Sequence, residues 1–216
     1  MDNAVALVQA YLRVNGYFTV AEYPVIEAAR FGYRSLTDLD ILALRFPGAG
    51  RLVPGRRALA SHPAAIFAPD PLLAAPEDAV DMLIGEVKEG RAELNEAAHD
   101  PAVLRTVLAR FGCCSLEETG PVVDELLRHG RLRLPSGHLV RLAVFGSSLG
   151  ARSPHGVALS VSLGHVVGFL EDYLREHWDV LAAAQFKDPA LGFLVTLEKA
   201  RRQRERGGGG SEGRDR

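Results

Sequence analysis

The alternation of apolar and polar positions predicts a helix followed by three strands in the first 90 residues. These elements cover residues 4–14, 17–30, 36–46 and 81–89. Apolar side chains recur at helical spacing in the first segment, and Asn15-Gly16 is a typical end of a helix. The first strand is rich in aromatic and β-branched residues and is expected to be interrupted or bulged near Pro24. Residues 31–35 are predicted to form the turn to the second strand.

The second half of the chain is predicted to be mainly helical, with one strand pair. A capping box of Ser115 and Glu118 marks the start of a helix that ends at His129-Gly130. Further helices are expected over 101–110, 162–184 and 189–199, and paired strands over 132–134 and 138–145. A helix followed by a two-stranded ribbon over 116–145 also fits the end of a winged helix-turn-helix. The apolar run of residues 142–145 instead favours a buried strand.

A long connection separates the second and third strands. Residues 47–80 are rich in Pro, Gly, Ala and Arg, with a short helix expected near residues 76–80. A connection of this length is uncommon unless it is functional or disordered. Arg51, Arg56 and Arg57 would suit contacts to a phosphate backbone, or they serve only to keep the loop solvated.

Composition limits the class of protein. The 216 residues carry a net charge of −2, and 47% are hydrophobic, which fits one domain over 1–200 with a helical extension from about residue 162. No apolar run has the length of a membrane span, and the first residues lack a basic signal start, so we expect no membrane partner and a cytoplasmic location. The adjacent Cys113 and Cys114 make neither a disulfide framework nor a zinc site. The Arg- and Gly-rich segment 201–216 is expected to be a disordered tail.

Charged residues on the second and third strands are the candidate chemistry. Side chains two apart in a strand share a face, so Asp38 and Asp40 project together, and so do Glu86 and Lys88. Carboxylate oxygens are the ligands that Mg²⁺ prefers, and a nearby lysine can orient or deprotonate a water. If the strands are neighbours, these groups could support metal-assisted hydrolysis of a phosphodiester. Alternatively, Glu86 and Lys88 are a solvated charge pair at a strand end.

Asp40, with Glu86-Val87-Lys88 as an E-x-K element, resembles the motif of the PD-(D/E)XK nuclease superfamily. The resemblance covers residues 4–146 and implies an α/β, three-layer restriction-endonuclease-like fold, with a mixed central sheet flanked by helices and additional C-terminal helices. The implied function is that of a nuclease that uses Mg²⁺ or Mn²⁺ on nucleic acid, DNA in preference to RNA, and leaves a 5′-phosphate. The sequence leaves open whether the protein is a homodimer.

The resemblance also implies roles for individual residues. Asp40 and Glu86 would ligate the metal together with the carbonyl oxygen of Val87, and Lys88 would position the attacking water. Asp38 is an alternative or second ligand, and Glu27 on the preceding strand could extend the acidic cluster. The 45 residues between Asp40 and Glu86 are a longer gap than the family pattern has.

Two alternatives to an active nuclease remain open from the sequence. One is a catalytically silent member of the same fold that only binds nucleic acid or protein, and the other is a winged-helix DNA-binding protein. The histidines show no metal-ligand spacing. His165 and His177, about three turns apart on a predicted helix, are expected to be core or surface residues.

Overall fold

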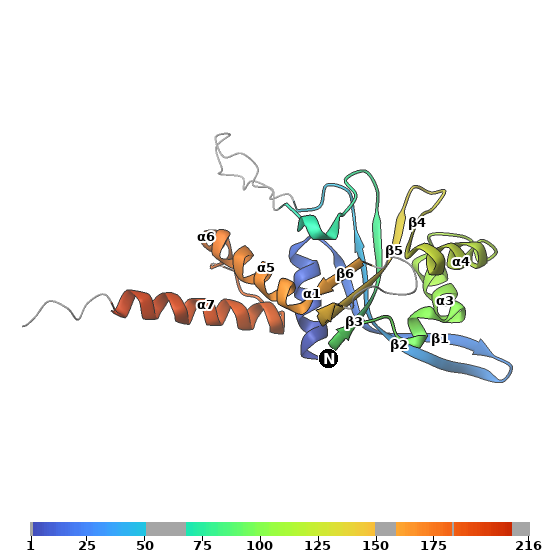
Figure 1. Ribbon diagram of the computed structural model, residues 1–216, viewed down its shortest axis with the longest axis horizontal. Helices are drawn as coiled ribbons and strands as arrows, with labels where there is room; N and C mark the ends of the chain where they lie inside the picture. Colours follow the sequence, from blue (N-terminus) through green and yellow to red (C-terminus); the bar gives the residue numbers. More distant parts are fainter. Residues whose placement is uncertain (1, 51–67, 150–158, 183, 209–216) are drawn as a thin grey trace, which may run out of the picture.

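A six-stranded mixed sheet forms the centre of the molecule (Figure 1). The computed structural model describes residues 2–50, 68–149, 159–182 and 184–208. Within these, the strands are β1 (Phe18–Ala29), β2 (Gly32–Arg45), β3 (Asp81–Ala92), β4 (Arg131–Arg133), β5 (Leu139–Leu149) and β6 (Leu159–Ser162). The helices are α1 (Asn3–Val14), η1 (Pro71–Leu73), α2 (Glu96–His99), α3 (Pro101–Phe111), α4 (Thr119–His129), α5 (Leu163–Glu176), α6 (Trp178–Leu181) and α7 (Pro189–Gly208).

The strand order is β1-β2-β3-β5-β4, with β6 also pairing with β5. β1, β2 and β3 form an antiparallel meander, whereas β5 runs parallel to β3 after the connection through α2, α3 and α4. β5 therefore lies inside the sheet, and the β4–β5 ribbon is not a free wing. The parallel pair of β3 and β5 explains why both strands have almost continuous apolar runs, since their central residues are covered on both faces.

Helices cover both faces of the sheet and give it two hydrophobic cores. On one face, α1 and α5 pack against the sheet, and α7 packs against these two helices, around fully buried side chains such as Tyr11, Phe145 and Leu170. On the other face, α3 and α4 bury Leu104, Leu108 and Leu126 against the sheet. The predicted mixed α/β architecture with helices on both sides is thus present.

Several local predictions are corrected by the structure. The strand β6 was not predicted. The single helix expected over 162–184 is divided, because His177, with φ −105° and ψ 21°, separates α5 from α6. The hydrogen bonds between Ser115 and Glu118 are present, but they close a turn, and α4 begins only at Thr119. Residues 76–80 form no helix, and the short helical turn in this connection is η1 instead.

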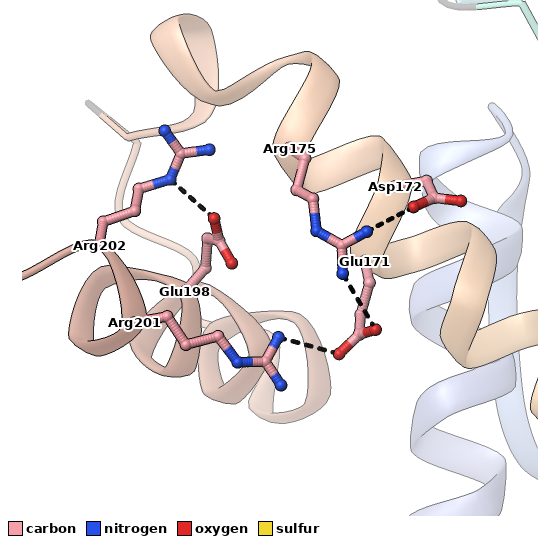
Figure 2. A network of polar contacts seen from close by, with 6 residues as sticks. All are labelled: Glu171, Asp172, Arg175, Glu198, Arg201 and Arg202. Atoms are coloured by element: carbon pink, nitrogen blue, oxygen red, sulfur yellow. Dashed lines mark hydrogen bonds and ion pairs between the residues drawn. The ribbon is translucent and has the colours of Figure 1, made fainter. Parts of the chain in front are cut away.

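The C-terminal helix is longer than predicted. α7 continues to Gly208, so residues 201–208, which were expected to belong to a disordered tail, are helical. Figure 2 shows the polar contacts that join this part of α7 to α5. Arg201 bonds Glu171 of α5, while Arg202 bonds Glu198 one turn earlier and lies 4.5 Å from the centroid of the Trp178 ring. Arginine, glutamine and glutamate are also good helix formers, which explains why a polar segment continues the helix.

Candidate functional site

Asp40 and Glu86 lie on neighbouring antiparallel strands. Ile41 of β2 is paired with Gly85 of β3, so Asp40 and Glu86 stand one step further along their strands, at the end of the shared ladder. The backbone N–H of Val87 donates a hydrogen bond of 2.8 Å to Oδ2 of Asp40. This bond holds the Asp40 carboxylate against β3, beside the segment that carries Glu86 and Lys88.

The Glu86 carboxylate is buried and incompletely hydrogen-bonded. Only 2% of the residue is exposed. Its Oε1 accepts a hydrogen bond of 2.7 Å from Nδ2 of Asn95 and lies 2.5 Å from Nζ of Lys88, whereas Oε2 is buried with no hydrogen-bond partner among the described residues. A buried carboxylate oxygen without a partner is costly, and such a group calls for a ligand or a functional reason.

Burial also sets the protonation behaviour of the pair. Burial raises the pKa of the Glu86 carboxyl, and the nearby charge of Asp40 acts in the same direction, while Lys88 and Asn95 oppose the shift. The hydrogen bond to Glu86 raises the pKa of Lys88 above its ordinary value of 10.5. Lys88 therefore stays protonated at neutral pH. In this protonated state its ammonium can donate hydrogen bonds to a water or stabilise negative charge, and it has no lone pair to accept a proton.

The strand β3 positions these groups because it leaves the core at this point. Residues 81–87 are all buried, whereas Lys88 is half-exposed and the register with β5 shifts between Lys88 and Arg91. Such irregularities often turn side chains near functional sites. A Cβ on Gly85 would lie 3.4 Å from Cβ of Ile41 and 3.5 Å from the Phe145 ring, so neighbouring groups approach this glycine closely on the face opposite to Glu86.

Two residues beside the site were not singled out from the sequence. Asn95 caps α2 by accepting a hydrogen bond from the N–H of Ala98, and its amide nitrogen reaches Glu86. Its only sequence signal is that of a helix cap. Glu22 of β1 lies opposite Asp40, between the pairs that Ala21 and Tyr23 make with β2, and it has a positive φ of 51°. No local pattern in the sequence indicates this placement.

Other predicted site residues lie elsewhere. Asp38 is exposed and pairs with Pro24, two residues further from the end of the ladder. Glu27 forms an ion pair with Arg34 near the end of the β1–β2 hairpin, six residues from Asp40 along β2, which is roughly 20 Å at strand spacing. Glu27 therefore does not extend the acidic cluster. Arg51, Arg56 and Arg57 lie outside the described residues.

The donor set is compatible with a Mg²⁺ ion held by two carboxylates. In the part of the chain that the structure describes, no three His, Cys, Asp or Glu side chains converge on one metal position. Mg²⁺ commonly keeps several waters and takes only one or two carboxylates from a protein, and Asp40 with Glu86 matches that number. The contact seen for Val87 is a donated hydrogen bond, and a role for its carbonyl oxygen stays a prediction.

Two polar networks tie the last part of the long connection and the start of β3 to the core. Asp81, at the start of β3, accepts hydrogen bonds from Arg141 and from the hydroxyl of Tyr17, all of them buried. Asp70, ahead of η1, accepts a hydrogen bond of 2.7 Å from the Tyr11 hydroxyl and lies 2.5 Å from Nε2 of His165. His165, whose side chain is 40% exposed, is thus a surface histidine, as expected, that also contacts a buried carboxylate.

None of the helices in the described ranges combines the length and the apolar character that a membrane span requires. Comparison with family models, with curated proteins and with solved structures found no match to this chain.

Proposed function

We propose that this chain is a Mg²⁺- or Mn²⁺-dependent nuclease of the PD-(D/E)XK type that hydrolyses phosphodiester bonds, with DNA as the preferred substrate. The observation that carries the proposal is the buried Glu86 carboxylate, which has an unpaired oxygen and lies beside both Asp40 and Lys88. A structural ion pair would not explain a buried oxygen without a partner, because a glutamate with no ligand to bind gains nothing from that position.

The topology supports the same proposal. An N-terminal helix, a strand, an acidic strand, an E-x-K strand and then a helix follow one another, which is the order that the resemblance to the PD-(D/E)XK superfamily implies. We therefore infer that the sheet and its helices form a restriction-endonuclease-like fold, with α5, α6 and α7 as the C-terminal addition.

Each residue of the site would have a defined role. Asp40 and Glu86 would bind the cation, with Asp40 fixed by the N–H of Val87 and Glu86 oriented by Asn95. A bound Mg²⁺ would polarise the scissile phosphate and lower the pKa of its water. Lys88 now neutralises Glu86, and it would turn its ammonium toward the phosphate and stabilise the negative charge that grows during attack.

The direct test is cleavage of labelled single-stranded, nicked and branched DNA, and of matched RNA, with EDTA, Mg²⁺ or Mn²⁺. We expect metal-dependent products that carry a 5′-phosphate, and we expect Asp40→Asn and Glu86→Gln to abolish them. Glu89→Gln removes an exposed carboxylate from the same strand and should leave cleavage unchanged. A wild-type protein without activity on any of these substrates would refute the proposal.

A catalytically silent nucleic-acid-binding protein is the second candidate. It is favoured by one observation, namely that the described residues supply two carboxylates and no third metal-binding side chain. Binding of DNA that is unchanged by EDTA, together with absence of cleavage, would identify this second function.

A further inference from the structure

The end of the β1–β2 hairpin carries a group of exposed aromatic side chains. This hairpin tip, residues 26–35, extends beyond α3 and away from the two cores (Figure 1). Phe31 is 90% exposed and Tyr33 is 82% exposed, and Ile26 beside them is 51% exposed. Folding gains little from apolar side chains in this position, so their exposure points to an interaction surface.

The register of the hairpin places these side chains near one another. Val25 pairs with Thr37 and Ile26 with Ser35, so Leu36 is an extra residue in β2 and the faces of the hairpin exchange there. Beyond this bulge Tyr33 pairs with Ala28, and Ile26 is its diagonal neighbour on the same face. Phe31 lies in the turn, two residues before Tyr33, so the three apolar residues are grouped at the end of the hairpin.

Arginines accompany the aromatic residues of the hairpin. The guanidinium carbon of Arg30 lies 5.4 Å from the centroid of the Phe31 ring, and Arg34 follows Tyr33 directly. The hairpin tip contains two arginines and a single acidic residue, Glu27, which is paired with Arg34. The tip is thus locally basic although the whole chain is weakly acidic.

We propose that the hairpin tip binds single-stranded nucleic acid, with bases stacked on Phe31 and Tyr33 and a phosphate held by Arg30. Exposed aromatic rings beside cationic side chains suit this partner, because every base has a face that stacks and every nucleotide carries a negative charge. This inference rests on the proposed function, and it specifies which form of nucleic acid the protein holds.

The hairpin also sets the distance between its tip and the candidate site. Phe31 and Asp40 lie nine residues apart, on or next to β2, which is roughly 30 Å at strand spacing. A stacked strand that rises ~3.4 Å per nucleotide would need about nine nucleotides to cover this distance. A single strand held at the tip can therefore place a phosphodiester at Asp40 and Glu86.

The test is the affinity for a fluorescein-labelled 20-nucleotide dT strand, measured by anisotropy in EDTA so that no cleavage occurs. The double variant Phe31→Ala/Tyr33→Ala should raise Kd by about tenfold or more, since one stacked base contributes a substantial part of the affinity. Phe193→Ala is the control, because Phe193 is also an exposed aromatic residue, on α7 and away from the tip, with 63% exposure. Arg30→Ala should lower the slope of log K against log salt by up to about 0.7.

Other outcomes would overturn the inference. Equal affinity of the double variant and the wild type, or stronger binding of a 20-base-pair duplex than of the single strand, excludes the tip as a single-strand surface. A wild-type dimer that the double variant converts to a monomer in light scattering assigns the tip to a second copy of the chain. If the wild type binds through the tip but cleaves none of the substrates, the nuclease proposal is refuted and this inference stands. Unchanged thermal melts show that the variants are folded.

Discussion

Glu86→Gln tests the candidate site most directly, because it changes charge and leaves size almost unchanged. The glutamine can still accept the hydrogen bond from Asn95. It loses the ion pair with Lys88, whose side chain is 42% exposed, so this loss is worth about 0–1 kcal/mol. It also removes a buried negative charge from the neighbourhood of Asp40.

The pKa of Glu86 is raised above its ordinary value of 4.5, and this fixes the sign of the pH dependence. Between 4.5 and the folded pKa, the native state binds more protons than the unfolded state, so stability falls as pH rises. The slope for one group is at most about 1.4 kcal/mol per pH unit. In Glu86→Gln this component should vanish, and we expect the variant to be at least as stable as the wild type at pH 8.

Denaturant unfolding between pH 4.5 and 8 measures this difference, with Glu89→Gln as the control. The same samples can be melted with and without 10 mM Mg²⁺. For an ion bound with a Kd of ~1 mM, the wild type should gain about 1.4 kcal/mol. This corresponds to a Tm increase of about 3–6 °C for a domain of this size. Glu86→Gln should show no increase.

Two results would refute this account of Glu86. A variant that is less stable than the wild type across the whole pH range would mean that Glu86 is a structural ion-pair residue. A wild type that gains no stability from Mg²⁺ or Mn²⁺ would leave the buried carboxylate without a metal to bind.

Three further predictions concern catalysis and folding. Lys88→Ala should abolish cleavage and spare metal-dependent DNA binding. Lys88→Arg should restore only part of the activity, because the guanidinium is planar and larger. Full activity of Lys88→Ala in the cleavage assay would contradict the role of Lys88. Arg141→Met should cost about 3–5 kcal/mol in denaturant unfolding because it leaves Asp81, which is 0% exposed, as an uncompensated buried charge. Gly146→Ala should cost about 1–3 kcal/mol, because its Cβ would lie 2.6 Å from the backbone nitrogen of Ala92; an unchanged denaturation midpoint would show that β3 and β5 can separate there.

The sequence was sufficient to predict the features that depend on residues close together in the chain. The apolar stripe of α1, the alternation in β2 and the apolar run of β3 each follow from side chains a few residues apart, and their types were predicted from that spacing. The same local rule puts Glu86 and Lys88 on one face of β3, and their side chains do contact each other.

Only the tertiary structure decided which charged groups meet. The pairing of Ile41 with Gly85 brings Asp40 to Glu86 across a connection of 45 residues, and a register is not encoded in either strand alone. Glu27 lies far from the site along the hairpin, which also contains the bulge at Leu36, although the sequence allowed Glu27 to extend the acidic cluster. Asn95 reaches Glu86 from a helix cap, and the pairing of β1 with β2 places Glu22 opposite Asp40. Burial of Glu86, and with it the raised pKa, depends on the strands and helices that exclude water, so it exists only in the folded chain.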